Sequence, residues 1–138
     1  MIRKITLLLG VLIVFLAMTH IFLWRIVRID GQYFFAQVPS READYEKGLG
    51  GRKTMSEKQA MLFNFDKKDK WAFWMKGMEF DLDIIWISDG KVVYIKKNFS
   101  ASSAEVAAPD VPADRVLEIR AGMADKYGLK VGDRADIF

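Results

Sequence analysis

The sequence predicts a mainly β fold: an antiparallel β-sandwich or barrel-like domain with one or two short helices, preceded by one N-terminal transmembrane helix. Three observations lead to this prediction. Several short runs of strand-forming residues are separated by turn residues, and no long helical pattern follows residue 28. An uncharged run of 20 residues near the start of the chain predicts the transmembrane helix. The pattern does not distinguish a sandwich from a barrel.

The uncharged run extends from Ile5 to Trp24. A helix of this length rises by about 30 Å, the thickness of a bilayer core. No Ala-x-Ala-like cleavage site follows the run, so we expect an uncleaved anchor rather than a removed signal peptide. The alternative is a buried helix. We therefore place the anchor and its basic flanks at residues 1–28 and the β domain at residues 29–138.

Positive charges flank the run on both sides and nearly balance. Arg3 and Lys4 precede it, while Arg25 and Arg28 follow it. A four-residue tail is the simpler side to leave in the cytoplasm. We therefore expect a single-pass protein of the cell membrane, with its domain on the extracytoplasmic face.

The charge and composition exclude several classes of function. The net charge is +3, but 4 of the 21 Lys and Arg flank the run, which leaves 17 against 18 Asp and Glu, a domain near −1. We expect no nucleic-acid partner. The chain has no Cys, and its one His, His20, lies inside the run. Disulfides, Ser-His-Asp and Cys-His catalysis and His-ligated metals are thereby excluded from the domain, and we expect no cofactor.

The first half of the domain combines one strand with two helical turns. GQYFFAQV (31–38) is rich in strand formers. Ser40 is the expected N-cap of a helical turn over 41–47, which Gly48 ends. Ser56 and Gln59 have capping-box spacing and predict a second helical turn.

The second half contains the remaining strands. Asp89-Gly90 between two apolar runs is a strong hairpin signal. Residues 66–70 form a charged turn, and 98–114, rich in Ala, Ser and Pro, form a surface loop. A short helix is expected at 121–128, and a last strand ends the chain. The other expected strands are 60–65, 71–75, 80–87, 91–97 and 115–120.

Alternation within 80–87 separates two faces, because strand side chains point to opposite sides in turn. Phe80, Leu82, Ile84 and Trp86 form one face. The other face begins with Asp81 and Asp83 and becomes apolar. We expect Trp74 to lie near Lys76 and these two acids, at the mouth of the fold.

Several segments together resemble the DUF192 family, small prokaryotic proteins without an established biochemical function. They are GLGGR (48–52), AMLF (60–63), FWMK (73–76), LDIIWI (82–87), DGKVV (89–93), VLEI (116–119), AG (121–122) and GL-x-x-GD (128–133). The resemblance covers about residues 30–138. It implies a mainly β, sandwich-like fold, and members are often exported or membrane-anchored.

The sequence departs from the family pattern at four positions. Gly77 and Met78 stand where Asn-Thr is usual, Asp81 where Pro is usual, and Ala60 where Gly is usual. A ligand site that used the Asn-Thr pair would be altered here. The matching polar residues are Arg52, Lys76, Asp83 and Glu118.

The favoured function is a membrane-anchored binding or accessory module rather than an enzyme. Its candidate ligand is a small polar molecule or a glycan, since aromatic faces with carboxylates and cations suit such ligands. The candidate site comprises Arg52, Trp74, Lys76, Asp83 and Glu118. A structural role is the alternative: the tryptophans would fill the core, and Arg52–Asp83 or Lys76–Glu118 would form buried ion pairs.

Two other functions remain open. Asp81, Asp83 and Glu118 could serve as acid and base in a hydrolase or glycan-active enzyme. Glu79, Asp81 and Asp83 alternate onto one face, which suits a hard cation weakly. Alternatively, the domain is a scaffold that docks a membrane protein through the 98–114 loop and exposed apolar residues of the Trp71–Ile87 corner.

Overall fold

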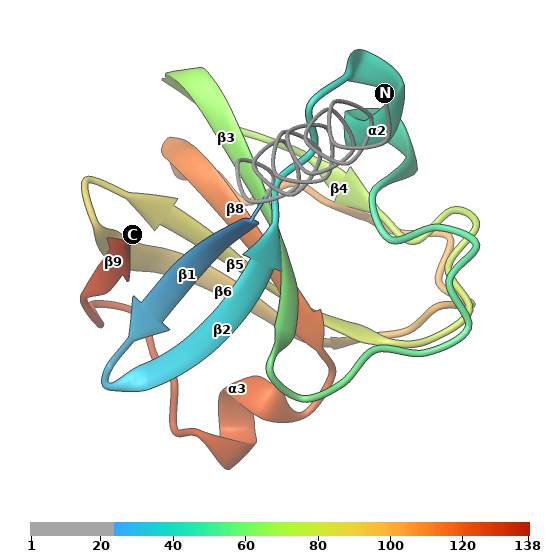
Figure 1. Cartoon of the computed structure of the whole chain (residues 1–138). Coiled ribbons are helices and arrows are strands. Elements are labelled where there is room, and N and C mark those ends of the chain that lie inside the picture. Colours follow the sequence, from blue (N-terminus) through green and yellow to red (C-terminus); the bar gives the residue numbers. More distant parts are fainter. Residues whose placement is uncertain (1–23) are drawn as a thin grey trace, which may run out of the picture.

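Two sheets and two short helices make up residues 24–138, the part of the chain that this computed structural model describes (Figure 1). The predicted mainly β class is confirmed. The elements are β1 (Trp24–Ile29), β2 (Gln32–Gln37), α2 (Glu42–Lys47), β3 (Gln59–Asp69), β4 (Phe73–Trp74), β5 (Leu82–Ser88), β6 (Lys91–Phe99), β7 (Val106–Ala107), β8 (Ala113–Arg120), α3 (Met123–Lys126) and β9 (Ala135–Ile137).

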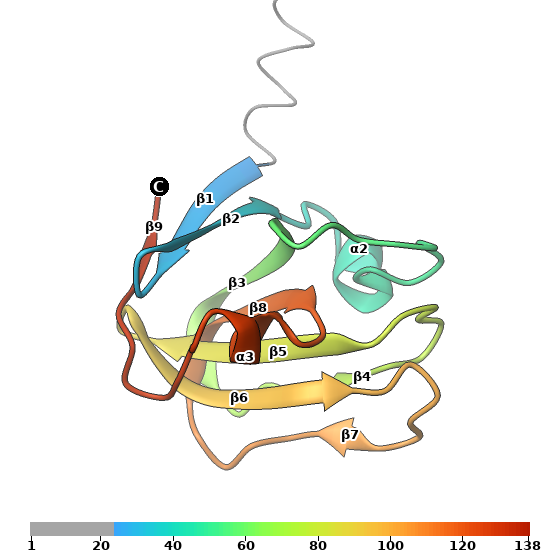
Figure 2. The same ribbon diagram turned by 90° about the horizontal axis from the view of Figure 1, so that it is seen from below.

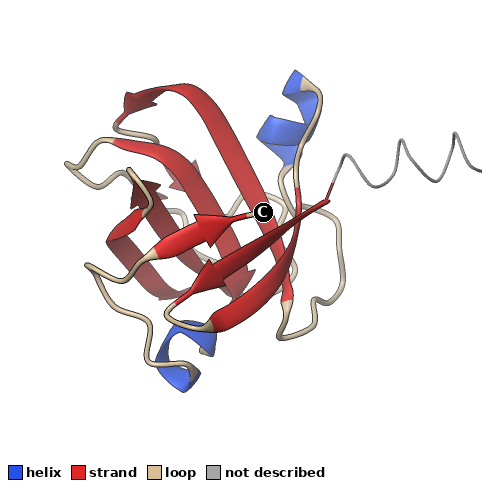
Figure 3. Ribbon diagram, turned by 60° about the vertical axis from the view of Figure 1, so that its left-hand side comes forward, coloured by secondary structure: helices blue, strands red, loops and turns tan. Residues whose placement is uncertain are grey.

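The large sheet has the strand order β6-β5-β8-β3-β2-β1-β9 and curls until its two outermost strands meet. Lys91 and Arg134 form a single antiparallel bridge at this junction. The amide of Val92 donates to the Asp133 carbonyl at 2.9 Å, which extends the junction. The sheet is therefore barrel-like, with one thin seam between β6 and β9. Figure 3 shows α2 and α3 at opposite ends of this body.

Two Asp-Gly turns build the hairpins of the sheet. Asp89 and Gly90 have φ angles of 50° and 71°, and they join β5 to β6 as predicted. Asp30 and Gly31, with φ angles of 46° and 79°, join β1 to β2 in the same way. Left-handed conformations at both central residues match the twist of the strands that such turns connect.

One strand pair departs from the antiparallel prediction. β2 and β3 run parallel, with Phe35 opposite Gln59 and Gln37 opposite Met61. Parallel neighbours need a crossover connection. Here the connection contains α2 and the glycine-rich turn after it, and α2 lies beside the middle of β3, where Tyr45 contacts Phe63 and Phe65.

The sheet has a hydrophobic core on each side of β3, β5 and β8. The barrel core lies inside the curl and includes Ile85, Ile87 and Leu117. The second core lies outside it, under the small β4–β7 sheet, and includes Ile84 and Trp86. Figure 2 shows β7 on the side of β6 that faces away from β1 and β2, with its partner strand β4 behind β6. The predicted two-faced pattern of 80–87 is confirmed, because β5 alternates between the two cores.

The start of the domain differs from the sequence prediction. Residues 24–28, assigned from the sequence to the anchor and its flank, belong to β1, which pairs with β2 and β9. Val27 and Ile29 point to the inner side and are fully buried in the barrel core. The rest of the predicted span, residues 5–23, lies outside the described residues. Within 24–138, no helix has the length and apolar character needed to cross a membrane.

Four smaller predictions were wrong. Ser40 is not the N-cap of α2, because Arg41 takes that position and its guanidinium binds the Asp44 carboxylate. Ser56 and Gln59 do not begin a helix: the Ser56 amide donates to the Gln59 side chain just before β3. The charged residues 66–69 extend β3 instead of forming a turn. In 71–75 only Phe73 and Trp74 form a strand.

Candidate functional site

An aromatic cavity of about 230 Å³ lies between α2, the turn after it, the middle of β3 and β4. We call it the aromatic pocket. Five side chains supply most of its apolar wall: Phe63 and Phe65 from β3, Phe73 and Trp74 from β4, and Trp71 just before β4. Tyr45 of α2 and Glu118 of β8 also line it. A mostly apolar cavity with few polar groups is the usual form of a small-molecule site.

The period of β3 positions the aromatic wall. Met61, Phe63 and Phe65 alternate onto the side of the second core, and Phe63 is buried while Phe65 is partly exposed. The Phe65 and Trp71 rings stack with centroids 3.8 Å apart. The Phe63 and Phe73 rings meet edge to face at 5.0 Å. Such contacts fix the rings that face the cavity.

The helix α2 adds one ring to this wall. Tyr45 lies edge to face with Phe63 at 5.8 Å, and its hydroxyl donates to the Asn64 carbonyl at 3.0 Å. No side chain of α2 is buried, so the helix lies on the surface and is attached mainly through this ring. The pocket thus has one wall from the sheet and another from the short helix α2.

Three tryptophans in this region have different roles. Trp86 is fully buried and donates its indole N–H to the Trp71 carbonyl at 2.9 Å. Trp71 donates its own indole N–H to the Ala113 carbonyl at 2.9 Å. Both are therefore anchored parts of the second core. Trp74 is 55% exposed at the pocket, and this large ring is available to a ligand.

Glu118 is the one buried acid that faces this cavity. On β8 it lies opposite Met61 of β3 and Ile84 of β5, two members of the second core. The residue is 4% exposed, and its Oε2 atom has no hydrogen-bond partner. Burial raises the pKa of Glu118 to about 8, although the positive charge of Arg52 opposes the shift. The side chain is therefore mainly a neutral carboxylic acid at pH 7.

Gly48 leaves the space around this carboxyl open. It ends α2 with φ 51° and ψ −127°, a conformation that side-chain-bearing residues rarely adopt. A Cβ atom at this position would lie 3.6 Å from Glu118 Oε2 and 3.5 Å from Phe63 Cζ. The glycine both ends the helix and lets the backbone pass close to the acid.

Charged side chains surround the mouth of the pocket. Lys47, Lys76 and Glu46 line it and are exposed. The Lys76 ammonium lies 5.8 Å from the centre of the Trp74 ring, within the range of a cation–π contact. Trp74 and Lys76 therefore lie together, as predicted from the sequence. Neither Asp81 nor Asp83 lines this cavity.

Arg52 lies on the other side of the glycine-rich turn. Its guanidinium donates to the Gln37 side chain at 2.5 Å, and the residue lines a separate, polar hollow. Lys47 and Gly48 line both hollows, so the turn is a thin wall between them. Arg52 does not line the aromatic pocket, but its positive charge acts on Glu118 and lowers the pKa of that carboxyl.

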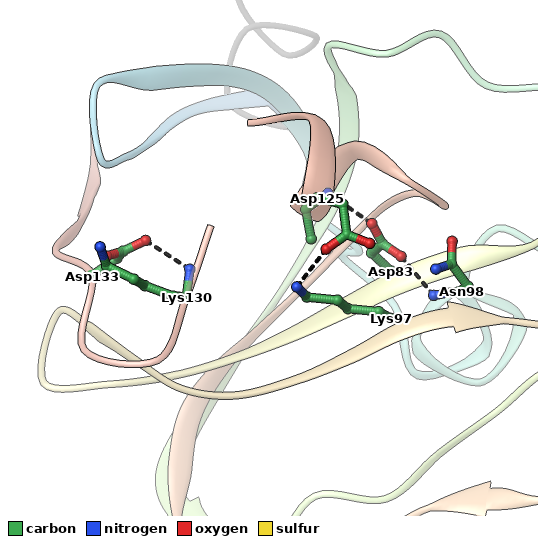
Figure 4. Close-up of polar contacts among 7 residues, drawn as sticks. Asp83, Lys97, Asn98, Asp125, Lys130 and Asp133 are labelled. Carbon is green, nitrogen blue, oxygen red and sulfur yellow. Dashed lines mark hydrogen bonds and ion pairs between the residues drawn. The ribbon is translucent and has the colours of Figure 1, made fainter. Parts of the chain in front are cut away.

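Asp83 has a structural environment. It is fully buried on the barrel-core side of β5. Its Oδ1 accepts the Asn98 amide at 2.7 Å, and its Oδ2 accepts the Ala124 amide at 2.8 Å (Figure 4). Asn98 has a positive φ of 49° near the end of β6, and Ala124 is in the first turn of α3. The carboxylate therefore ties β6 and α3 to β5.

The pairs predicted from the sequence are absent from the described residues. Neither Arg52–Asp83 nor Lys76–Glu118 is an ion pair within 24–138. Asp83 lies opposite Ile119 while Glu118 lies opposite Ile84, so the two acids point to opposite faces of the sheet. This separation contradicts a shared acid–base site. Among residues 24–138, no three acidic or His side chains converge to hold a metal ion.

Most of the pocket wall was missed in the sequence analysis. The predicted set contributes Trp74, Lys76 and Glu118, whereas Arg52 and Asp83 lie elsewhere. The sequence did contain a signal for Phe63 and Phe65, because AMLFNF places them two residues apart on one face of a strand. Tyr45 carried no such signal, since its contact with Phe63 depends on how α2 folds back over the sheet.

Comparisons with known proteins agree with this architecture. The sequence pattern of DUF192, described as an uncharacterized ACR, matches residues 25–137. No curated protein sequence matches the chain. The crystal structure of a proposed transcription regulator from Sinorhizobium meliloti superposes with a TM-score of 0.76 at 28% identity, covering 82% of this chain and 92% of that one. A protein of unknown function from Novosphingobium aromaticivorans gives a TM-score of 0.74 at 27% identity, covering 82% and 83%.

Proposed function

The chain belongs to the DUF192 family, and we propose that its domain is a membrane-anchored binding module that holds a small, uncharged polar ring such as a sugar. One observation supports this proposal above the others. The aromatic pocket contains a buried carboxyl whose Oε2 has no partner in the protein. Leaving a buried polar atom unpaired costs about 1–3 kcal/mol, and a ligand hydroxyl would remove that cost.

The chemistry of the pocket suits a sugar ring. A neutral carboxylic acid both donates and accepts a hydrogen bond, as a hydroxyl does. Glu118 would form such a pair at the floor, while the exposed face of Trp74 would cover the apolar C–H face of the ring. A few polar groups within an aromatic wall give orientation as well as affinity.

The charges at the mouth favour an uncharged ligand over a cation. Lys47 and Lys76 outnumber Glu46 there, and Arg52 lies behind the glycine-rich turn. A bound ammonium would be repelled by these groups and would require Glu118 to lose its proton first. For an uncharged ligand the acid form is the donor, so we expect affinity to fall as the pH rises through about 8.

The location of the module is proposed from the sequence. The uncharged residues before β1 are long enough to span a bilayer, and two basic residues precede them. We place the domain on the extracytoplasmic face, where glycans are abundant ligands. We also keep the prediction that nucleic acid is not a partner, because the domain has a net charge near −1.

A titration of the full chain in lipid nanodiscs with mono- and disaccharides, including N-acetylated amino sugars, tests the proposal. Saturation-transfer NMR at pH 6 should show contact with at least one sugar, and calorimetry should give its affinity. Trp74→Ala and Glu118→Ala should weaken binding at least tenfold. Tyr33→Ala removes a ring that is 48% exposed but does not line the pocket, and should leave affinity unchanged.

Two results would contradict the proposal. One is that no sugar in the panel binds at pH 6. The other is that binding survives both pocket variants, which would place the site elsewhere on the domain. An affinity that rises with pH through 8 would instead show that ionised Glu118 accepts the hydrogen bond, and so would contradict the neutral acid as the donor.

The scaffold alternative receives less support. In the Trp71–Ile87 corner, Trp74 is the one large hydrophobic side chain that is exposed. Its neighbour across the small sheet, Val106, is 57% exposed and lies in the Ala/Ser/Pro segment. Two side chains make too small a patch for a stable protein interface, which needs roughly 20–30 residues a side.

A further inference from the structure

The outer face of β1, β2 and β9 carries the densest group of exposed apolar side chains among residues 24–138. Nine large hydrophobic side chains are exposed in this part of the chain, and five of them lie on this face. They are Trp24, Ile26, Tyr33, Phe35 and Phe138, with exposures of 43%, 41%, 48%, 53% and 63%. We call this surface the β1–β2 face.

These side chains are exposed because of the strand period, and the strands that carry them are well packed. Val27 and Ile29 of β1 and Phe34 and Ala36 of β2 are fully buried in the barrel core. Residues that alternate with them must point outward. A sheet with one buried face usually has polar residues on the other, so apolar residues on both faces indicate a second contact.

The register gathers the exposed side chains into a row. Ile26 lies directly opposite Phe35 in the antiparallel pair. On its other side, the Ile26 amide donates to the Phe138 carbonyl at 3.2 Å, and the Phe138 amide donates to the Ile26 carbonyl at 2.9 Å. The row therefore crosses three chain segments. Trp24, two residues before Ile26 in β1, lies on the same face.

A polar row borders the apolar one. Arg28 lies opposite Tyr33 and Asp136, and its guanidinium binds the Asp136 carboxylate at 2.5 Å. The same guanidinium lies 5.5 Å from the centre of the Phe138 ring. The face thus changes from apolar near Trp24 to charged near the Asp30-Gly31 turn, as a surface lying at a membrane interface does.

The chain itself indicates what covers this face. The uncharged run of the sequence reaches Trp24, and Trp24 is already the first residue of β1. No linker residue is left between a span ending at residue 23 and the paired strand. A domain joined to a bilayer in this way is held within a few ångströms of the lipid headgroups, with the Trp24 end of β1 nearest.

We propose that the β1–β2 face rests on the headgroup region of the bilayer that holds the N-terminal run, so that the domain has a fixed orientation on the membrane. This inference rests on the membrane anchoring in the proposed function. Trp and Tyr are enriched at lipid interfaces, where the ring is partly buried and its polar atom stays hydrated. Ile26, Phe35 and Phe138 supply the apolar area that enters the interface.

The proposed orientation leaves the aromatic pocket accessible. Figure 2 shows β7, the partner strand of β4, on the opposite side of the domain from β1 and β2. Trp74 and Val106 are paired across this small sheet and are both more than half exposed, so the sheet that carries them lies away from the proposed membrane contact. A ligand can reach the pocket while the β1–β2 face is covered.

Single cysteines give a direct test, because the natural chain has none. Phe35→Cys and Phe138→Cys report on the β1–β2 face. Val106→Cys, at a side chain 57% exposed on β7, is the matched control. Each full-length variant is labelled with an environment-sensitive fluorophore and placed, one copy per disc, in nanodiscs containing lipids with a shallow spin-label quencher. We expect quenching at least threefold stronger at residues 35 and 138 than at 106.

A further variant separates docking from simple proximity. Phe35→Asp, added to the Phe138→Cys reporter, should abolish most of the quenching by placing a charge at the interface. The side chain is exposed, so thermal unfolding should remain close to that of the parent chain. Flotation of the unlabelled chain with liposomes tests anchoring independently of docking.

The outcomes are distinct. Equal quenching at 35, 138 and 106 in protein that floats with lipid would overturn the docked orientation and leave the anchoring intact. Quenching that persists in Phe35→Asp would also overturn it. A chain that does not float would contradict the anchoring itself. Quenching that appears only when two copies share a disc would show that a second chain, rather than lipid, covers the face.

Discussion

Asp83 and Glu118 are two buried carboxyl groups on adjacent strands, and they differ in their hydrogen-bond partners. Asp83 faces the barrel core and accepts two backbone amides from distant segments. Glu118 faces the second core, opens into the aromatic pocket and leaves Oε2 unpaired. Burial alone therefore does not mark a functional group in this fold. The unpaired Oε2 is what distinguishes Glu118, because most buried polar groups have a hydrogen-bond partner.

Replacing Asp83 should have the largest effect on stability. Asp83→Ala leaves the amides of Asn98 and Ala124 without their charged acceptor. Hydrogen bonds to a charged group contribute about 1.5–3 kcal/mol each, so we expect a loss of about 3–6 kcal/mol in the free energy of unfolding. Urea unfolding followed by tryptophan fluorescence measures it.

Asp133→Ala is the matched control for this loss. Asp133 is also buried, but its Oδ2 accepts only the Lys130 amide, at 2.8 Å, among the hydrogen bonds of the described residues (Figure 4). Asp133→Ala should lower the free energy of unfolding by about half as much as Asp83→Ala. Equal losses of stability in the two variants, or a loss below about 1 kcal/mol in Asp83→Ala, would contradict the role of Asp83 in holding β6 and α3 against β5.

Glu118 should make stability depend on pH in the opposite sense from a paired acid. Its pKa is about 8 in the folded chain and close to 4.5 when unfolded. Between these values the unfolded chain ionises more readily, so stability should fall as the pH rises from 4.5 to 8, by on the order of 4 kcal/mol. Glu118→Gln keeps the shape of the side chain but cannot ionise, so it should remove this fall in stability.

The measurement is urea unfolding of the wild type and of Glu118→Gln at several pH values between 5 and 9. The ion-paired acids Asp44, Asp69 and Asp136 have lowered pKa values, so their contribution is lost only at more acidic pH. Identical pH profiles for the wild type and Glu118→Gln would show that the Glu118 carboxyl is not neutral in the folded protein.

Gly48→Ala tests the open approach to Glu118. The backbone angles at this residue belong to a region that is nearly exclusive to glycine, so the change should cost about 2 kcal/mol. The added methyl group would also lie 3.6 Å from Glu118 Oε2 and should weaken sugar binding. Gly31→Ala also introduces a side chain at positive φ, but nothing lies within 4 Å, so it should leave binding unchanged.

Trp74→Ala should have the smallest effect on stability. The side chain is more than half exposed, and we expect a change within about 0.5 kcal/mol. Trp86→Ala, in the fully buried ring of the same core, should cost about 3–5 kcal/mol. If the two costs were similar, Trp74 would be a packing residue, and its role at the mouth of the pocket would be withdrawn.

Much of the fold could be predicted from local signals. The Asp89-Gly90 hairpin, the two faces of β5 and the strand at Gln32–Gln37 each follow from a few neighbouring residues. The same signal was present at Asp30-Gly31. It was missed because residues 24–28 were assigned to the anchor, which left Asp30 with no strand before it.

The non-local features could not be predicted. The parallel pairing of β2 with β3 and the seam between Lys91 and Arg134 depend on how distant segments meet. The partners of the buried acids could not be predicted for the same reason. Alternation placed Asp83 on a defined face of its strand, but no pattern placed Ala124 within reach of its carboxylate. Nor could sequence show that Arg52 binds Gln37 instead of an acid.

The state of the Glu118 carboxyl tests the central claim most directly. Its ¹³C NMR signal, assigned by its loss in Glu118→Gln, should be followed from pH 4 to pH 10 in the full chain. We predict a midpoint near 8, which would show that Glu118 is mainly a neutral acid in the aromatic pocket at physiological pH. A midpoint near 4.5, the ordinary value for glutamate, would show an ionised, well-solvated group and would contradict the proposed site.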